Sequence, residues 1–586
     1  MSGIDIVVVV YNSSKWLKGL IQSLEKSEYP LKDIHLTFVD NASSDDSVSK
    51  LLNFQKNSKL GSFNVHDLKE NIGFGRGNNF GFKNTKQPFA FFLNVDTEVL
   101  PNTISELMNA ALNSDSDVAL WECRQFPYEH PKFYNPVTLE TSWASAAACL
   151  VKREYFTEVG GFDQNIFMYA EDVDLSWRFR AHGYKLQYVP KSVVYHYTYQ
   201  SAGEVKPNQF YNSTFNNLML RYKFGTTKDI LKGYLMYNTL YGIKGPSDKH
   251  KSRLLKGFFK SIPLGLKFGR WNRKNKKLGF KPNFRGWDYE LIRDGAFYVN
   301  EGPKENPLIS VIVRTCGRPN VLRETLKSLE NQTYNNIQVV IVEDGPDISK
   351  EMIEKEFLSL NYIYQSTVDK VGRCEVGNIA LSLADGEYFN FLDDDDVFYA
   401  DHIEVLINTI LNNPQYDAAY SLAFETPIRI HSLNPYIYDE LFHNIQYRQK
   451  FNKLLILNQN YFPIQTVLFS RKLYDIYGGF DLELEYLEDW DLWIRYTMNS
   501  KFLFVEKVTS IYRVPAERTV NHERQQKLDE YLKIVKNKHK DTEMKLTVGE
   551  LREEVEGIAQ KTNIVYQLKN TSFKVLLYKA AKKVFK

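Results

Sequence analysis

The 586-residue sequence contains only four cysteines, and their positions lack the paired spacing of a zinc site or a disulfide framework. No apolar run reaches the roughly 18 residues that a membrane-spanning helix needs. The N-terminus has no basic segment before its first apolar run, which argues against a signal peptide. The net charge of +3 says little about partners, and we expect no nucleic-acid partner. These features predict a cytoplasmic protein that meets membranes only at their surface.

Two acidic segments of matching pattern occur at residues 169–178 and 486–495, each shortly after a Gly-Gly-Phe-Asp sequence. Each segment packs three carboxylates into four positions, and such a cluster is costly to desolvate, so a purely structural role is hard to find. A carboxylate there could serve as a general base. The alternative is an acidic helix start that the helix dipole favours. The repetition in matching surroundings favours a functional role.

The first half of the chain alternates short apolar runs with segments of helical period. The apolar runs at residues 4–10, 34–39 and 89–93 are typical of buried strands, and each ends in polar residues. A glycine-rich loop at 70–79 precedes the third run. Strands that alternate with helices predict an α/β fold with a mostly parallel sheet and a site at the carboxyl ends of its strands.

The same order of segments returns from residue 308, which predicts a tandem duplication of one α/β domain. We expect the two domains at residues 1–205 and 305–525, a helical basic linker region at 206–304 and a helical tail at 526–586. Corresponding residues lie 299 to 317 positions apart. The corresponding pairs are Tyr11 with Arg314, Asp40 with Glu343, Asp96 with Asp395, and Asp172 with Asp489.

Three segments outside the two domains carry alternatives. The basic run at 270–281 is a solvated face by default, and contact with anionic lipid or a pyrophosphate-linked acceptor is the alternative. A heptad pattern at 544–565 predicts either self-association into a homo-oligomer or docking on the second domain. A basic amphipathic helix at 573–586 predicts an interfacial anchor on the inner membrane surface, with a docked terminal helix as the alternative.

Aspartates at the ends of the predicted strands suggest a metal-assisted reaction. Asp96, and Asp393 with Asp395, suit Mg²⁺ or Mn²⁺, which prefer oxygen ligands and leave positions open for phosphates. Such an ion would offset the charge of a departing sugar-nucleotide diphosphate. Asp172 and Asp489 would take a proton from an acceptor hydroxyl, and a single base per site implies inversion at the anomeric carbon. For Asp96 alone, a turn or cap aspartate is the alternative, whereas a run of four aspartates needs a counter-ion.

Short motifs in both halves carry a family resemblance. The first half contains Asp40-Asn41-Ala-Ser, Asn71-Ile-Gly-Phe-Gly, Asn94-Val-Asp96-Thr, Glu171-Asp172-Val-Asp174 and Tyr195-His196. The second contains Arg314-Thr315, Gly372-Arg373, the aspartates Asp393 to Asp396, and Glu488-Asp489-Trp-Asp491. As a set, these motifs resemble family 2 glycosyltransferases of the GT-A fold, a Rossmann-like fold, over residues 4–205 and 307–515. The first half resembles the bacterial rhamnosyltransferase-like branch.

The resemblance implies a role for each matching position. Asp172 and Asp489 would be the catalytic bases, and Asp96, His196 and Asp395 would be the metal ligands. For His196, a satisfied core histidine is the alternative. The nucleotide sugars would be bound by Tyr11, Asn12, Asp40, Asn71 and Asn94 in the first half, and by Arg314, Thr315, Glu343 or Asp344, Arg373 and Asp393 in the second.

Two departures from the family pattern concern the metal. Asn94 stands where the motif has its first aspartate, which leaves one fewer carboxylate in the first half. The second half has Tyr512-Arg513 where the first has Tyr195-His196, so its histidine ligand is in doubt, and His522 is only a distant candidate.

The resulting hypothesis is a bifunctional inverting glycosyltransferase on the inner face of the cytoplasmic membrane. It would transfer sugars from nucleotide-diphosphate donors, with dTDP-rhamnose implied for the first domain, to a lipid-linked bacterial surface polysaccharide such as O-antigen or capsule. One alternative keeps a single catalytic domain and makes the other a non-catalytic acceptor-binding module. A carbohydrate-binding scaffold without turnover is the alternative from a different class.

Overall fold

A computed structural model describes residues 3–198, 204, 206–295 and 305–562 of the chain. The chain divides into two compact units on either side of residue 300, and each is described by itself. Among the described residues, no helix is both long enough and apolar enough to cross a membrane. The predicted amphipathic segment at 573–586 lies outside the described residues, as does the end of the heptad pattern after residue 562.

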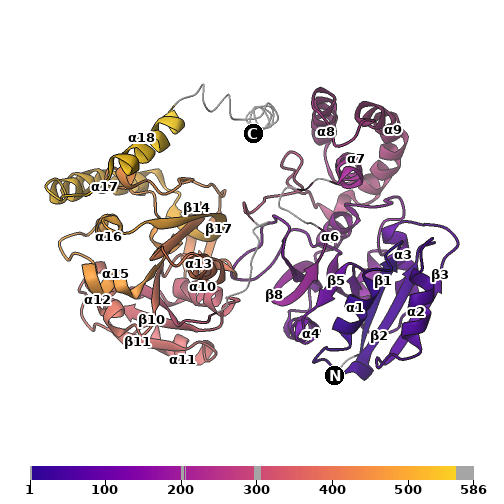
Figure 1. Cartoon of the computed structure of the whole chain (residues 1–586), viewed down its shortest axis with the longest axis horizontal. Helices are drawn as coiled ribbons and strands as arrows, with labels where there is room; N and C mark the ends of the chain where they lie inside the picture. The colour runs from indigo at the N-terminus through magenta and orange to yellow at the C-terminus, as the bar shows by residue number, and fades with distance from the viewer. Residues whose placement is uncertain (1–2, 199–203, 205, 296–304, 563–586) are drawn as a thin grey trace. The chain divides into compact units, whose positions relative to one another are not determined.

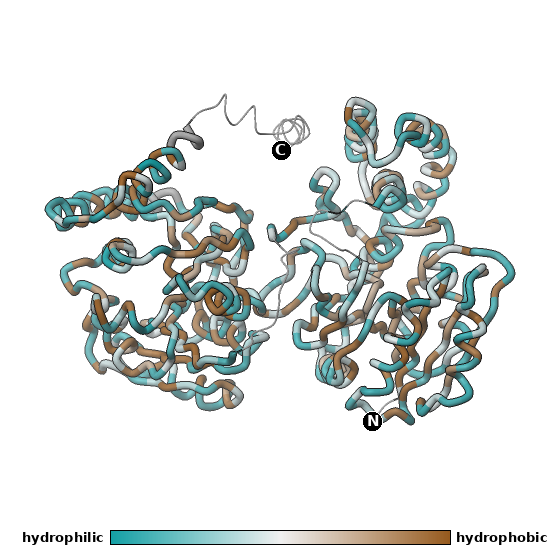
Figure 2. Tube along the Cα trace, in the orientation of Figure 1, coloured by the Kyte–Doolittle hydropathy of each residue, from teal (hydrophilic) through white to brown (hydrophobic). Residues whose placement is uncertain are grey.

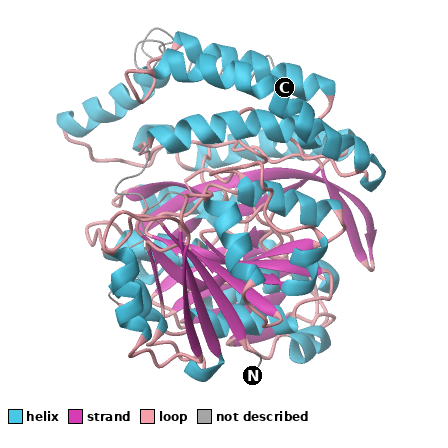
Figure 3. Cartoon of the chain, turned by 90° about the vertical axis from the view of Figure 1, so that its right-hand side faces the viewer, coloured by secondary structure: helices cyan, strands magenta, loops and turns pink. Residues whose placement is uncertain are grey.

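The first unit is built on an eight-stranded mixed sheet with the strand order β3-β2-β1-β4-β7-β6-β8-β5. Strands β3, β2, β1 and β4 run parallel, and β7 then pairs antiparallel with β4. Figure 3 shows the strands fanned out between helices on both sides. The strands are β1 (Ile4–Val10), β2 (Ile34–Asp40), β3 (Ser62–Asp67), β4 (Phe89–Leu93), β5 (Thr97–Val99), β6 (Val118–Phe126), β7 (Ala148–Lys152) and β8 (Lys185–His196).

Six helices connect these strands, and three more follow them within the same unit. The connecting helices are α1 (Leu17–Leu24), α2 (Ser47–Gln55), α3 (Phe74–Lys83), α4 (Thr103–Asn113), α5 (Arg153–Glu158) and α6 (Glu171–Ala181). The following helices are α7 (Pro207–Phe224), α8 (Thr227–Thr239) and α9 (His250–Lys274).

The second unit repeats the same sheet order, as β11-β10-β9-β12-β16-β14-β17-β13, with β15 added beside β14. Its strands are β9 (Ile309–Thr315), β10 (Ile337–Glu343), β11 (Tyr362–Ser366), β12 (Tyr388–Asp393), β13 (Val397–Phe398), β14 (Ala418–Leu433), β15 (Tyr436–Glu440), β16 (Val467–Ser470) and β17 (Phe502–Pro515). Its helices are α10 (Pro319–Glu330), α11 (Lys350–Glu356), α12 (Arg373–Leu383), α13 (His402–Leu411), α14 (Lys453–Ile456), α15 (Arg471–Tyr477), α16 (Glu488–Thr497), α17 (Arg518–Lys538) and α18 (Val548–Thr562). The predicted fold class of two duplicated GT-A-like α/β domains is thus confirmed.

The central strands are mostly apolar because helices cover both faces of each sheet. β1 is almost fully buried, and the apolar stripe of α1 packs against it. Figure 2 shows hydrophobic residues concentrated along the strands. Most polar side chains therefore collect where the strands end, and the parallel strands β1, β2 and β4 end at the same edge.

Helix α18 covers most of the segment with the heptad pattern. It docks on α14 through Glu554, whose carbonyl accepts a hydrogen bond from Asn452 Nδ2 at 2.8 Å. Val548, Leu551 and Val555 remain exposed on this helix. Docking on the second unit therefore occurs, while self-association through the exposed residues stays a prediction.

Candidate active site

The carboxyl ends of β1 and β2 hold three of the residues expected to bind a nucleotide. Val10 and Asp40 are register partners in the parallel pair, which places Tyr11 and Asn12 beside Asp40. Asp40 is fully buried, and its Oδ2 accepts a hydrogen bond from the Ser43 backbone at 2.8 Å. Its Oδ1 is buried without any hydrogen-bond partner. A buried acceptor without a partner is costly, so Asp40 is suited to receive a donor from a ligand.

Asn71 and Asn12, both predicted to contact the nucleotide, stabilise the loops around Asp40. Asn71 Oδ1 accepts hydrogen bonds from Asn41 Nδ2 at 2.9 Å and from the Gly73 backbone at 3.0 Å. Asn12 Oδ1 accepts from the Ser44 backbone at 2.7 Å, and its φ of +48° lies in the left-handed region that asparagine tolerates. Tyr11 is half exposed and has no such role in the loops. The two asparagines thus shape the rim of the site, in addition to any contact with a ligand.

Asn94, Asp96 and His196 come together at the end of β4. Thr97 of β5 is the antiparallel partner of His196 on β8. This register brings His196 close to Asn94, although the two residues are 102 positions apart in the sequence. His196 Nε2 lies 3.5 Å from Asp96 Oδ1 and 3.3 Å from Asn94 Nδ2. Burial alone would raise the pKa of Asp96, but when His196 is protonated, its hydrogen bond and charge hold that pKa below its usual value.

The tautomer of His196 favours a metal-binding role. Its Nδ1 lies 2.8 Å from Gln125 Oε1, an amide oxygen that can only accept, so Nδ1 carries the proton and Nε2 presents a lone pair. Asn94 Oδ1 is buried without a partner. Within the described residues, no three His, Cys, Asp or Glu side chains form a metal-binding group. Asp96 and His196 would therefore hold Mg²⁺ or Mn²⁺ together with substrate phosphates rather than in a closed protein cage, and such open sites suit these ions.

Helices α6 and α16 begin in the same unusual way. The N-cap residues Ala170 and Leu487 have φ values of +66° and +58°, in the left-handed region that costs non-glycine residues energy. This turn places a Glu-Asp pair in the first turn of each helix, Glu171-Asp172 in one and Glu488-Asp489 in the other. The structure thus reproduces the sequence repeat as one local geometry.

The first Glu-Asp pair is electrostatically strained. Glu171 is buried, and its Oε2 has no hydrogen-bond partner. Burial, and then the charge of Asp172, raise the pKa of Glu171 to about 8. Burial also raises the pKa of Asp172, although its Oδ1 accepts a hydrogen bond from the Val173 backbone at 2.8 Å. A half-buried aspartate with a raised pKa is a stronger base than an ordinary aspartate, which suits it to accept a proton.

The second Glu-Asp pair is neutralised by arginine. Arg314 makes a two-pronged contact with Asp393 at 2.8 and 3.0 Å and reaches Glu488 Oε1 at 3.1 Å. Arg373 NH1 lies 3.5 Å from the same Glu488 oxygen. Burial, and then the charge of Glu488, raise the pKa of Asp489 to about 7, and Asn460 donates to Asp489 Oδ2 at 2.8 Å.

The run of four aspartates obtains its counter-charge from the protein. Arg318 pairs with Asp394, which also accepts a hydrogen bond from Thr315 Oγ1 at 2.7 Å. The Arg513 backbone donates to Asp396 Oδ1 at 3.0 Å. The Asp395 side chain is more exposed than the side chains of Asp393 and Asp394. Arg318 NH1 lies 3.4 Å from Asp395 Oδ2. The run alone is therefore no evidence for a metal, and the role of Asp395 as a ligand stays a prediction.

The structure distinguishes between Glu343 and Asp344 as ligand contacts. Both oxygens of the buried Glu343 are already occupied, by the Gly317 backbone, by Ser349 and by the Tyr364 hydroxyl at 2.5 to 3.0 Å. Asp344 is only half buried, and one of its oxygens, Oδ1, accepts from the Val371 backbone at 2.7 Å. The geometry therefore favours Asp344.

The histidine position of the first unit is filled differently in the second. The Arg513 side chain donates to the Tyr438 hydroxyl at 2.7 Å and pairs with Glu324 at 2.7 Å, so it does not act as a metal ligand. His522 is exposed on α17, 3.2 Å from Gln526 Nε2.

The third carboxylate of each acidic segment has a structural role, which corrects the expectation that such a role is hard to find. Asp174 is fully buried and pairs with Arg178 at 2.8 Å and with Lys223 of α7 at 2.5 Å. Lys223 also pairs with Asp163 of the Gly-Gly-Phe-Asp sequence at 2.7 Å. Burial opposes ionisation of Asp163, but the charge of Lys223 lowers its pKa to about 2.

The second unit contains the same arrangement of one lysine paired with two aspartates, here called a lysine clamp. Lys538 of α17 pairs with Asp481 at 2.5 Å and with Asp491 at 2.7 Å, and His539 Nε2 lies 2.8 Å from Asp491. In each unit, a lysine from a helix beyond the sheet thus fixes the turn in front of the Glu-Asp pair. Neither lysine stands out in the sequence, because its partners lie 47 to 60 residues away.

Residues after α9 also reach the first site, although the sequence predicts them as linker. Glu290 pairs with Arg180 of α6 at 2.5 Å, and the Tyr289 ring lies 5.8 Å from that of Trp143. Burial, and then the charge of Asp172, raise the pKa of Tyr289. No periodicity in the sequence marks this return of the chain.

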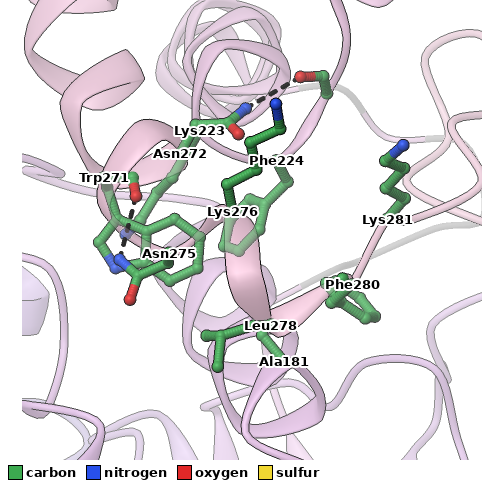
Figure 4. Close-up of a pocket in the computed structure, with 12 residues that line it drawn as sticks. Ala181, Lys223, Phe224, Trp271, Asn272, Asn275, Lys276, Leu278, Phe280 and Lys281 are labelled. Carbon is green, nitrogen blue, oxygen red and sulfur yellow. Dashed lines mark hydrogen bonds between the residues drawn. The ribbon is translucent and has the colours of Figure 1, made fainter.

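A cavity of about 60 Å³ lies apart from the predicted site residues, between the end of α7 and the residues after α9. Figure 4 shows it between Phe224, Trp271 and Phe280, with Lys276 and Lys281 among the residues around it. Binding sites for ligands of drug size typically enclose roughly 300 Å³ or more, so this cavity is too small for a sugar nucleotide.

The lysine clamps generate a stability prediction. Replacing Lys223 by Met leaves the buried Asp174 and the half-buried Asp163 with one fewer partner each, and breaking a buried ion pair costs about 3–5 kcal/mol. Lys538→Met should cost less, because the Lys538 side chain is 34% exposed against 1% for Lys223. Urea unfolding of the full chain measures both. The control is Lys185→Met, which removes an exposed pair with Asp117 and should change stability by less than about 1 kcal/mol. Equal losses for Lys223→Met and Lys185→Met would contradict the clamp.

The chain is similar to several known proteins. An uncharacterized glycosyltransferase of Rickettsia prowazekii is 30% identical over 239 residues, which cover 39% of this chain and 70% of that protein. Another from Rickettsia conorii is 23% identical over 430 residues, which cover 70% of this chain and 64% of that protein. The crystal structure of S. aureus TarS covers 47% of this chain and 52% of that protein, with 15% identity and a TM-score of 0.33.

The sequence profile of the family described as "Glycosyl transferase family 2" matches residues 5–171 and 310–474, more than half of the chain and one copy in each unit. The chain therefore belongs to glycosyl transferase family 2.

Proposed function

We propose that this chain is a bifunctional inverting glycosyltransferase with one active site in each unit. The observation that carries the proposal is the repeated Glu-Asp pair behind a left-handed residue, at the start of α6 and again at the start of α16. In each copy, the aspartate has a raised pKa. We assign the two transferase domains to residues 1–205 and 305–525, the basic helical region to 206–304 and the tail to 526–586.

In the proposed reaction, an acceptor hydroxyl attacks the anomeric carbon of a nucleotide-diphosphate sugar. The new bond forms from the hydroxyl oxygen to this carbon, the bond to the diphosphate breaks, and the proton passes to Asp172 or Asp489. A bound Mg²⁺ or Mn²⁺ would stabilise the charge of the departing diphosphate. Asp96 and His196 would hold it in the first unit, and Asp395 would contribute in the second. Asp40 and Asp344 would accept hydrogen bonds from the nucleotide.

The resemblance to the rhamnosyltransferase-like branch suggests dTDP-rhamnose as the first donor. The proposed acceptor is a lipid-linked glycan of a bacterial surface polysaccharide, O-antigen or capsule. Residues 573–586 would hold the protein on the inner membrane face, and residues 544–565 would support a homo-oligomer.

One observation favours a second candidate, in which the second unit is a non-catalytic acceptor-binding module. In the second unit, Arg314 forms ion pairs with both Asp393 and Glu488. In the sequence, Arg513 stands where the first unit has His196. In such a module, these ion pairs would persist when ligand binds. In an active site, at least Asp393 would turn to a ligand.

Single-site variants distinguish the two candidates. The full chain with Asp489→Asn retains only the first base, and the full chain with Asp172→Asn retains only the second. Because losing a general base typically costs about 10²–10⁴-fold in rate, each variant should lose one activity in a screen of nucleotide sugars with Mn²⁺. Asp117→Asn on the surface is the control. If Asp489→Asn leaves every activity intact, the second unit is a binding module, and if neither change has an effect, both candidates fail.

The raised pKa of Asp489 predicts a pH dependence for the second site. A base must be ionised to accept a proton, so the turnover of Asp172→Asn should fall as pH drops through about 7. The pH profile of kcat/KM measures this transition. Replacing Glu488 by Gln removes the neighbouring charge that helps to raise the pKa, so the transition should move to lower pH. A profile that is flat between pH 6 and 8, values roughly one unit either side of the expected transition, would rule out Asp489 as the base.

A further inference from the structure

We infer that helices α8 and α9 form a docking surface for an anionic lipid membrane. The surface consists of six exposed apolar residues, here called the α8–α9 face. It does not depend on the identity of donor or acceptor. Its members are Leu231, Leu235, Leu255, Phe259, Ile262 and Leu266.

The apolar residues of the α8–α9 face are unusually exposed. Leu231 is 65% exposed, Phe259 is 64% exposed and Leu266 is 59% exposed. On α9, the four members are spaced by 4, 3 and 4 residues, so they form one stripe along the helix. Leu231 and Leu235 are spaced by 4 residues on α8 and form a shorter stripe. Exposed apolar stripes of this length mark interaction surfaces rather than scattered surface residues.

Both stripes point away from the body of the unit. α8 and α9 both pack on α7 (Figure 1), and their buried residues, such as Gly233 of α8 and Gly265 of α9, are not members of the stripes. On α8, the Tyr234 hydroxyl contacts the Tyr222 hydroxyl of α7 at 3.0 Å. On α9, a β-carbon at Gly265 would come within 2.5 Å of the Tyr222 ring, so the two helices are in close contact there. Tyr234 also bonds Ser261 of α9 at 2.9 Å, which joins the two helices into one layer.

The charge around the face is almost entirely positive. Residues 227–281 contain 15 Lys and Arg but only two acidic residues, Asp229 and Asp248. Asp229 is already used in the capping box of α8 with Thr226. Figure 2 shows hydrophobic and hydrophilic residues alternating along both helices. An apolar stripe bordered by cations is the pattern of a helix that lies in the interface of an anionic membrane.

The lysines also favour lipid over a protein partner. Lys251, Lys256, Lys260 and Lys267 lie on α9 beside the apolar stripe and are exposed. Protein–protein interfaces are depleted of lysine in their cores, because an ammonium group is costly to desolvate there. At a membrane, a lysine stem can lie along the apolar layer while its ammonium group reaches the lipid headgroups. The α8–α9 face therefore fits a lipid surface better than a second protein.

Vesicle binding of the full chain tests the inference. We expect the chain to float with vesicles of phosphatidylglycerol mixed with phosphatidylcholine, and to float much less with phosphatidylcholine alone. The double variant Phe259→Ser with Leu266→Ser should bind the mixed vesicles at least tenfold more weakly. Lys256→Glu with Lys267→Glu should weaken binding most at low salt, where charge attraction is strongest. The matched control is Leu112→Ser with Leu358→Ser, which changes two exposed leucines elsewhere and should leave binding unaltered.

Three outcomes would overturn the inference. In the first, the double variant floats as well as the unchanged chain while its circular dichroism and unfolding curve show an intact fold. In the second, removal of residues 573–586 abolishes binding and the α9 variants have no effect. In the third, light scattering shows that the double variant turns a dimer into a monomer without changing lipid binding, which would identify the face as a contact between copies.

Discussion

Burial on both faces of the central strands is the constraint on which both units depend. Strands β1, β2 and β4 are enclosed by helices, so most of their side chains are apolar. Most charged groups then collect where the strands stop, and parallel strands stop at the same edge. Asp40, Asp96 and their neighbours gather for this reason, and the second sheet repeats the arrangement with Glu343 and Asp395.

On this shared frame, the two units balance charge in opposite ways. The first leaves Glu171 without a counter-ion, so the buried carboxyl stays protonated near neutral pH, and it places His196 beside Asp96. The second places Arg314 between Asp393 and Glu488. Duplication therefore preserved the backbone and the Glu-Asp pair while the surrounding ion pairs diverged. If both units are active sites, as proposed, this difference suits them to different substrates.

Much of the frame could be predicted from the sequence because it depends on local pattern. The apolar runs that become β1, β2 and β4 end in turn residues, and the Glu-Asp pairs repeat in matching surroundings. The antiparallel strand β7 and the clamps of Lys223 and Lys538 could not be predicted, because each depends on a partner that is distant in sequence and marked by no periodicity. The four aspartates were expected to need a counter-ion, and Arg318 and Arg314, 76 and 79 residues from their aspartate partners, supply positive charge in the structure. Likewise, Glu343 matches a ligand-binding position in the motif, yet its contacts with Ser349 and Tyr364 appear only in three dimensions.

Lys223 lies on α7, the helix that also supports α8 and α9, and it binds Asp174 in the helix that carries Asp172. Glu290, beyond α9, holds the same helix through Arg180. The α8–α9 face and Asp172 are thus parts of one continuously packed body. If a ligand at either place shifts α7, lipid binding and acceptor binding are coupled. Thermodynamic reciprocity then requires a single factor: lipid changes the affinity for acceptor as much as acceptor changes the affinity for lipid. In a transferase built in this way, binding of the acceptor and binding of the membrane would be energetically coupled.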